Sequence, residues 1–310
     1  IIKKERIDIP LHLSTQANVV NWASAVFWQE QGIERIILAR ELSREEIKEI
    51  RAKTDIELEM FVHGSMCISY SGRCLLSNYM AARDANRGKC AHSCRWKYYL
   101  MEEKRPGEYY PVFEDDQGSY IMNSGDLCLI RYIPEIIDTG VDSIKIEGRM
   151  KSLHYTATVT SVYRQALDLY YQDPENYQFD ENWLEELRKA SHRRYISGFF
   201  LNPPGPEEQN YRTSAYQRDY DFMGIVRDYL PARAEAVVEV RHKFVKGDKL
   251  EITGPGITPF ETELDYIISE DGEMVESAPH ARELIRIPVK QEVKPYYLVR
   301  REKGPDGRKD

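Results

Sequence analysis

Residues 35–65 read RIILARELSREEIKEIRAKTDIELEMFVHGS, and this stretch decides the fold. It opens on an apolar run at 35–39 that predicts a short buried strand. Ser43 follows, with Glu46 three residues later, and this capping box predicts the start of a helix. Apolar residues then alternate over 56–62, which predicts another strand. Strands and helices that alternate with short connections indicate a parallel sheet.

The same alternation continues on both sides of this stretch. Further strands are expected at 9–13, 120–123 and 143–147, and further helices at 19–31, 127–138 and 153–171. Five such units predict an α/β fold, a TIM-like (β/α)-barrel truncated at its N-terminus, because a closed barrel needs eight. The absence of an initiator Met agrees with a truncated chain. An open sheet is the alternative.

From residue 220 onward the pattern changes to short segments that alternate every second residue. Turn sequences such as Lys246-Gly247-Asp248 separate these segments, which predicts a small C-terminal all-β barrel domain. The expected division is a partial barrel at 1–175 with a cysteine-rich insertion at about 64–118, a helix and linker at 176–219, the β-barrel domain at 220–302 and a disordered tail at 303–310.

Charge and composition restrict the kinds of partner. The chain has 310 residues, and 51 acidic against 43 basic residues give a net charge of −8, which argues against general binding of polyanions. A role with nucleic acid therefore needs a local basic patch. No apolar run is long enough for a membrane span and no secretory leader is visible, so we expect a cytoplasmic protein without a membrane partner.

Four of the five cysteines lie within 28 residues and directly follow the strand at 56–65. They are Cys67, Cys74, Cys90 and Cys94, with six, fifteen and three residues between them. Four thiolates suit a tetrahedral zinc ion or an iron–sulfur cluster, and the wide first spacing favours the cluster. Zinc and buried free thiols are the alternatives. Cys128 lies among apolar positions of the helix expected at 127–138, and we interpret it as a core residue.

A basic and aromatic segment overlaps the cysteines. Six basic residues accompany one acid, Asp84, between positions 73 and 97; they are Arg73, Arg83, Arg87, Lys89, Arg95 and Lys97. The interleaved aromatic residues are Tyr70, Tyr79, Trp96, Tyr98 and Tyr99. This combination is typical of single-stranded RNA recognition, and a solvated surface loop is the alternative. A second basic group at 188–194 either extends this surface or is an exposed helix end.

Polar residues also follow the expected strands. They are His12, Gln16 and Asn18 after the first, Arg40 after the second, His63 at the end of the third, and Glu147 and Arg149 at the end of the fifth. On a barrel these positions converge on one mouth, where Arg and His side chains hold a small dicarboxylate. Each residue taken alone is equally well explained by a loop hydrogen bond or a helix cap.

The sequence at 59–77, EMFVHGSMCISYSGRCLLS, resembles the signature of the collagenase-like peptidase family, peptidase family thirty-two of unassigned type. Further motifs of that family follow in order, NRGKC at 86–90, CRW at 94–96, NSGDL at 123–127 and KIEGRMKS at 145–152. The resemblance runs from about residue 9 to the β domain. The first strands of the family are missing from this sequence, so the substrate pocket is expected to be incomplete.

The resemblance implies an iron–sulfur enzyme that hydroxylates RNA bases or quinone precursors without molecular oxygen. The chain is most similar to those members that use prephenate and convert the wobble uridine of tRNA to 5-hydroxyuridine. The resemblance implies that Cys67, Cys74, Cys90 and Cys94 bind a [4Fe-4S] cluster. We predict His63, Arg40 and Glu147 as catalytic residues, and as substrate-binding residues His12, Gln16, Asn18, Arg73, Arg87, Arg95 and Arg149.

Two other functions remain open. Proteolysis is weakly disfavoured, because the sequence has neither a His-Glu-x-x-His pair nor a Gly-x-Ser-x-Gly elbow. Cys67 with His63 or His92 would form a nucleophile and base, but a thiolate bound to metal does not attack a carbonyl. A non-catalytic RNA-binding module stapled by zinc is the other alternative. The C-terminal domain is expected to grip tRNA, to pack against the first domain, or to form a homodimer or a contact with a related subunit.

Overall fold

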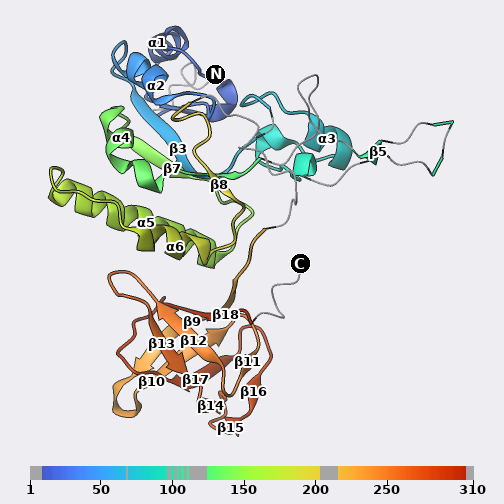
Figure 1. The fold of residues 1–310 in the computed structure, drawn as a ribbon, viewed down its shortest axis with the longest axis vertical. Coiled ribbons are helices and arrows are strands. Elements are labelled where there is room, and N and C mark those ends of the chain that lie inside the picture. Colours follow the sequence, from blue (N-terminus) through green and yellow to red (C-terminus); the bar gives the residue numbers. More distant parts are fainter. Residues whose placement is uncertain are drawn as a thin grey trace. The chain divides into compact units, whose positions relative to one another are not determined.

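The computed structural model describes residues 9–67, 69–95, 99–100, 103–104, 106–107, 110–111, 124–202 and 216–304. The chain divides into two compact units (Figure 1). The first contains residues 1–150, 163–183 and 192–216, and the second contains 151–162, 184–191 and 217–310. The first unit is mixed α/β and the second holds an antiparallel sheet, as the sequence predicts at this level.

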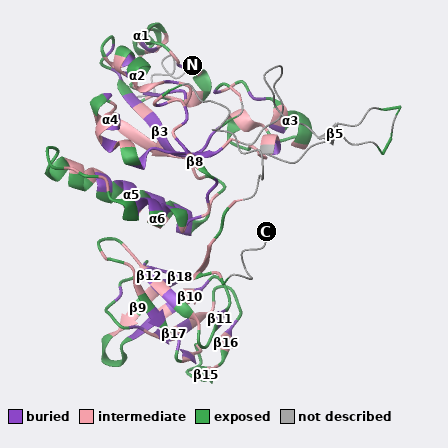
Figure 2. Ribbon diagram, viewed as in Figure 1, coloured by how far each residue is buried: buried purple, intermediate pink, exposed green. Residues whose placement is uncertain are grey.

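A six-stranded sheet organises the first unit. Its strands are β1 (His12–Leu13), β2 (Arg35–Ile37), β3 (Glu57–Ser65), β6 (Asp126–Cys128), β7 (Ser143–Ile146) and β8 (Tyr195–Ile196). The order is β1-β2-β3-β6-β8, and β7 pairs with β3. Strands β1, β2, β3 and β7 run parallel to one another, whereas β6 runs antiparallel to β3. Six buried residues in a row, 60–65, make β3 the centre of this unit (Figure 2).

The described sheet does not close into a barrel, and β6 is the clearest departure from the prediction. A (β/α)-barrel has only parallel strands, and β6 is antiparallel to β3. The helix expected at 127–138 is therefore wrong in its first part. Residues 126–128 are all buried as strand residues, and the helix α4 (Ile133–Asp138) begins only after a 3₁₀ turn at 130–132. The strand expected at 120–123 lies outside the described residues.

Most other expected elements are found with shifted ends. The helices are α1 (Trp22–Glu30), α2 (Arg44–Arg51), α3 (Leu76–Ala81), α4, α5 (Leu153–Gln172) and α6 (Glu181–Arg188). The capping box of α2 is confirmed, because the Ser43 side chain accepts from the Glu46 N–H and the Glu46 carboxylate accepts from the Ser43 N–H. A short hairpin of β4 (Tyr99–Leu100) and β5 (Tyr110–Pro111) follows the cysteine-rich segment. Among the described residues, no helix combines the length and hydrophobicity that a bilayer-spanning segment requires.

The second unit is built on an eight-stranded antiparallel sheet of order β13-β12-β18-β9-β10-β17-β14-β15, with β11 and β16 paired beside it. These strands are β9 (Tyr220–Leu230), β10 (Glu235–Val240), β11 (Phe244–Val245), β12 (Lys249–Thr253), β13 (Phe260–Glu263), β14 (Ile267–Ile268), β15 (Met274–Val275), β16 (Ser277–Ala278), β17 (Leu284–Pro288) and β18 (Leu298–Glu302). Val238, Phe244 and Ile252 are fully buried in its core. The all-β character of the C-terminal domain is thus confirmed.

A buried ion network ties helical residues to the sheet of the second unit. Arg300 on β18 is 0% exposed and contacts Glu186 at 2.6 Å, and it also pairs with Glu251 on β12. Lys189 lies 2.9 Å from Glu251 and 3.3 Å from Glu186. Burial acts to raise the pKa of Glu186, but the hydrogen bonds and charge of Arg300 outweigh it and lower that pKa. The network therefore stabilises the charged forms of Glu186, Lys189 and Arg300.

His154 lies beside this network, stacked on Phe222 at 5.7 Å, and is 4% exposed. Burial and then the charge of Arg300 lower its pKa to about 4, against a weaker opposite effect of Glu186. In the unfolded chain His154 takes up a proton near pH 6.5, whereas in the folded chain it stays neutral down to about pH 4. The free energy of unfolding therefore falls as the pH is lowered from 6.5 toward 4. We expect the second unit to lose about 2 kcal/mol between pH 7.5 and pH 5.

Hydrogen exchange of the β10 and β18 amides at both pH values measures this loss. The carboxylates with lowered pKa take up protons below pH 5, so they do not account for the loss of stability between pH 7.5 and pH 5. His154→Gln removes the titrating group, and its stability should fall much less between the same two pH values. An equal fall in the two proteins would contradict the assignment.

Candidate metal centre and substrate site

The site begins where β3 ends, because Cys67 follows that strand by two residues. Gly64 has a φ of +109°, and a Cβ placed on it would lie 2.3 Å from the carbonyl oxygen of Glu147. The Glu147 N–H donates to the His63 carbonyl at 2.8 Å, which joins the ends of β3 and β7. Only glycine fits this close approach. The backbone of Glu147 therefore fixes the position of the chain that leads to Cys67.

The carboxylate of Glu147 holds the same piece of backbone. Its Oε2 accepts from the Ser65 N–H at 3.2 Å, and its Oε1 accepts from the Arg149 N–H at 3.3 Å. The side chain of Ser65 is buried, and its Oγ has no hydrogen-bond partner in the described part of the chain. Glu147 thus lies half-buried at the strand ends and positions the residues that precede Cys67.

A second carboxylate, Glu41, anchors the segment between the first two cysteines. It accepts from the Ser71 N–H at 2.9 Å and from the Ser71 hydroxyl at 3.1 Å. Gly72 has a φ of +77°, and a Cβ there would lie 2.0 Å from the backbone oxygen of Gln16. Residues after β1 and β2 therefore hold the chain beside Cys74. Nothing in the spacing of the sequence indicates this contact of Glu41, which is 30 residues from Ser71.

Among the described residues, the four cysteines predicted as ligands form no disulfide bond. Cys74 is buried, Cys90 and Cys94 are half-buried, and Cys67 is an exposed residue whose thiol the surrounding chain desolvates. This desolvation raises the pKa of Cys67, and Cys74 and Cys90 raise it further as like charges, against a backbone hydrogen bond from Ser69 and the charge of Arg40. Cys67, Cys74 and Cys90 are therefore electrostatic neighbours.

Four thiols are the donor set of either an iron–sulfur cluster or a zinc ion. The N–H of His92 donates to Sγ of Cys90 at 3.3 Å, and such N–H to sulfur bonds tune the thiolates of iron–sulfur proteins. His92 adopts a φ of +56° to make this contact. Within the described ranges, no three His, Cys, Asp or Glu side chains are arranged around one ion position. The donor set is nevertheless all thiol, the set that iron–sulfur clusters take.

Exposed aromatic and basic residues surround α3 in the same segment. Tyr70 and Tyr79 are 65% and 90% exposed, and Arg73 and Arg83 are also exposed. Arg87 pairs with the acid Asp84 at 3.4 Å and stays largely exposed. Figure 2 shows this exposed surface on α3. The side chains of Arg95 and of residues 96–99 lie outside the described residues.

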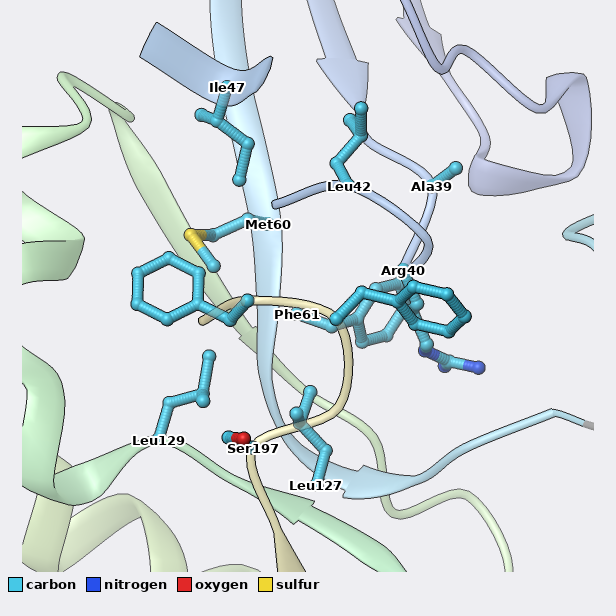
Figure 3. Close-up of a pocket in the computed structure, with 11 residues that line it drawn as sticks. Ala39, Arg40, Leu42, Ile47, Met60, Phe61, Leu127, Leu129 and Ser197 are labelled. Carbon is cyan, nitrogen blue, oxygen red and sulfur yellow. The ribbon is translucent and has the colours of Figure 1, made fainter. Parts of the chain in front are cut away.

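Arg40 lies between the cysteine segment and an apolar cavity. Its guanidinium stacks over the Phe61 ring at 3.9 Å, and its charge acts on Cys67. Figure 3 shows the cavity, which has a volume of about 20 Å³ and is lined by Met60, Phe61, Leu127 and Ser197 among others. This volume holds about one water molecule. Of the described residues that line it, Arg40 alone is charged.

His63, which the sequence predicts to be catalytic, is buried in the interior. It is 1% exposed, and its ring lies edge-on to Tyr163 at 5.6 Å and to Tyr195 at 5.4 Å. The Tyr163 hydroxyl donates to the Val62 carbonyl at 2.8 Å and accepts from the Leu129 N–H at 3.1 Å. Burial raises the pKa of Tyr163 well above its ordinary value. The sequence gives no signal for these tyrosines except their place on the apolar side of α5 and at β8.

The remaining predicted residues divide into two groups. Arg149 contacts Gly88 two residues before Cys90, since a Cβ there would lie 2.0 Å from its NH1. His12 is exposed on β1 and Gln16 is exposed after it, and Asn18 is half-buried with an Oδ1 that has no hydrogen-bond partner among the described residues. Gln16 and Arg149 thus reach the cysteine segment, whereas no described contact joins His12 to it.

The structure corrects the predicted positions of Arg193 and Cys128. In the basic group at 188–194, Arg193 is 3% exposed and pairs with Asp126 at 3.3 Å, so it is part of the interior and not of an RNA surface or a helix end. Cys128 is buried as predicted, but it lies on β6 opposite His63 and not on a helix.

Comparison with known proteins identifies relatives over nearly the whole chain. The sequence model of peptidase family U32 matches residues 1–210, and that of the U32 C-terminal domain matches residues 218–300. The tRNA hydroxylation protein P1 of Bacillus subtilis is 43% identical over 296 residues, 96% of this chain and 70% of that protein. The tRNA hydroxylation protein P of Escherichia coli is 37% identical, over 96% of this chain and 74% of that protein.

A collagenase of Porphyromonas gingivalis is 30% identical over 93% of this chain and 71% of that protein. A solved C-terminal domain of a U32 peptidase from Geobacillus thermoleovorans is 33% identical, covers 26% of this chain and 99% of that domain, and has a TM-score of 0.26. The resemblance seen in the motifs is thereby confirmed, and the chain belongs to peptidase family U32.

Proposed function

We propose that this protein is an enzyme that hydroxylates tRNA. The observation that carries this proposal is its identity of 34–43% to several tRNA hydroxylation proteins over most of its length. The exposed tyrosines and arginines around α3 support it, because such residues bind phosphates and stack on unpaired bases. We infer that the target is the wobble uridine, which becomes 5-hydroxyuridine.

We further propose that Cys67, Cys74, Cys90 and Cys94 hold a [4Fe-4S] cluster. The effect of Cys74 and Cys90 on the pKa of Cys67 and the N–H to sulfur bond at Cys90 support a cluster, and zinc is the alternative. When bound, such a cluster supplies one-electron chemistry. Glu147 and Glu41 hold the backbone that carries the thiols, and the tyrosines and arginines around α3 bind and orient the unstacked base.

Prephenate is the co-substrate that we propose, and Arg40 is the residue that we expect to bind it. A guanidinium holds a carboxylate through two parallel hydrogen bonds, and Arg40 lies close enough to Cys67 to act on its charge. The cavity behind Arg40 holds about one water molecule, so the dicarboxylate has to lie on the other side of the guanidinium. We also propose that the parallel strands β1, β2, β3 and β7 belong to a (β/α)-barrel.

Peptide hydrolysis is a second candidate, because of the collagenase relative. It needs a free thiolate with an adjacent base. His63 is buried between Tyr163 and Tyr195, and this placement does not favour it as the base for the exposed Cys67. Hydroxylation is therefore the better supported function.

The test replaces a predicted ligand and follows both metal and product. Cys74→Ser is expected to lose iron and the visible absorbance of anaerobically purified protein, and to leave tRNA unhydroxylated in a deletion strain. Mass spectrometry of the tRNA nucleosides measures the product. Cys128→Ala removes a buried thiol that is not in the predicted set, and it should keep both iron and product.

Three results would contradict these proposals. Zinc in place of iron would exclude the cluster, and unchanged hydroxylation by Cys74→Ser would exclude its role in the reaction. Cleavage of peptides by the purified protein, lost in Cys74→Ser while the tRNA product persists, would favour the peptidase.

A further inference from the structure

A group of arginines surrounds one carboxylate on the sheet of the second unit. Glu239 on β10 accepts from Nε and NH2 of Arg227 at 2.9 and 2.7 Å, and Arg241 lies 2.7 Å from its other oxygen. Hydrogen bonds from Arg227, and then the charges of Arg227, Arg241 and Arg282, lower the pKa of Glu239. Three arginines therefore act on this one carboxylate.

The arginines keep donors for another partner. Each guanidinium has five N–H donors, and the two oxygens of Glu239 use only a few of them. Arg241 and Arg282 are exposed, and in the part of the chain that the structure describes Arg282 forms no ion pair within 4 Å. Glu239 therefore orders Arg227 and Arg241 without neutralising the group.

An exposed aromatic ring lies next to these arginines. The Tyr296 ring centre is 5.8 Å from the Arg227 guanidinium, and Tyr296 is 73% exposed. Its φ of +73° is unfavourable for a residue with a side chain, and its N–H donates to the Val226 carbonyl at 2.8 Å. Strained backbone of this kind collects at binding sites, where it fixes a side chain in place.

The acidic residues of this unit are concentrated elsewhere. Residues 260–276, which include β13, β14 and β15, contain seven Asp and Glu and no Lys or Arg. The arginines lie on or next to the central strands β9, β10 and β17, whereas β13 and β15 are the two ends of the sheet order. A polyanion is thus attracted to one part of the unit and repelled from another, which fixes its orientation.

We propose that the surface formed by Arg227, Arg241, Arg282 and Tyr296, here called the β-sheet surface, binds RNA. The arginines contact phosphates and Tyr296 stacks on an unpaired base. An acidic peptide would satisfy the arginines but would leave the exposed ring without a flat partner, so RNA is the better fit. This inference rests on the proposed function, since tRNA is the RNA concerned, and it adds a binding surface separate from the cysteine segment.

The test measures the affinity of the full chain for unmodified tRNA between about 50 and 200 mM salt. Arg241→Gln with Arg282→Gln is expected to weaken binding about tenfold and to lower the slope of log affinity against log salt by about 2. Lys246→Gln with Lys249→Gln removes the same charge near β13 and Glu276, and should change affinity by less than about twofold.

Tyr296 gives a second measurement that does not depend on charge. Tyr296→Gly removes the ring and relieves the positive φ, so the variant is expected to fold. It should weaken binding about tenfold with the salt slope unchanged, while Tyr296→Phe keeps the wild-type affinity. These two signatures separate stacking from attraction of charge.

The outcomes distinguish this inference from the proposed function. If wild-type protein hydroxylates tRNA but the arginine pair and the lysine pair weaken binding equally, the β-sheet surface is excluded and the function stands. If a polyglutamate peptide competes as well as tRNA, the surface binds acidic protein and not RNA.

Discussion

Arg300→Met is expected to lower the free energy of unfolding of the second unit by about 3–5 kcal/mol. Arg300 is 0% exposed and contacts Glu186 and Glu251, so its removal leaves two half-buried carboxylates that share Lys189 as a positive partner. Uncompensated buried charge costs more than the lost ion pair itself. For a domain of this size the melting midpoint should fall by about 15 °C or more. Differential scanning calorimetry with hydrogen exchange of β18 measures both quantities.

The neighbouring residue provides a matched control. Arg301 is on the same strand and pairs with Asp221 and Asp248, but its side chain is 22% exposed. Arg301→Met should therefore cost about 1 kcal/mol or less. Adding Glu251→Gln to Arg300→Met removes one of the stranded charges and should recover part of the stability. Equal costs for Arg300→Met and Arg301→Met would show that burial of the network has no energetic role.

Gly64→Ala is expected to cost about 4 kcal/mol and to disrupt the segment that carries Cys67. A φ of +109° strains any residue with a Cβ by about 1–3 kcal/mol, and overpacking against the Glu147 backbone adds about 1–3 kcal/mol more. The Glu147 carboxylate should then lose its contact with the Ser65 N–H. Urea denaturation measures the stability, and exchange of the Ser65 amide measures the local change.

Gly247 separates the two causes. It has a φ of +89°, but a Cβ there would meet no described atom within 4 Å. Gly247→Ala should show the conformational strain without the steric contact, and should leave the first unit unchanged. If the two substitutions cost the same, close approach of Glu147 is not the reason for glycine at position 64.

The parts of the fold that the sequence predicts correctly are those with local signals. Ser43 and Glu46 form their capping box from residues three apart, and the alternation over 56–62 marks β3. β6 was mistaken for a helix because Leu127, Leu129 and Ile130 give a short apolar run without a distinct period. The strand pairs with His63 and its neighbours far away in sequence, and no local pattern records that pairing.

The same distinction applies to the candidate site. Four cysteines close together in sequence were easy to recognise as a set, and three of them are electrostatic neighbours in the structure. The carboxylate that holds the segment, Glu41, is 30 residues from Ser71, so spacing alone does not predict their contact. Arg193 looked like part of a basic surface because the sequence does not show that Asp126 lies opposite it in the interior.

The register of β3 shifts at Val62, whose carbonyl accepts from both the Leu129 N–H and the Tyr163 hydroxyl. From there to Ser65, where β3 ends, the face on which each side chain lies is set by its count from Val62, because successive strand side chains point to opposite sides. Insertion or deletion of one residue in this interval would turn every later side chain over, whereas many substitutions would not. Anyone who transplants the thiol segment to another scaffold should therefore carry residues 62–67 with it as one uninterrupted piece.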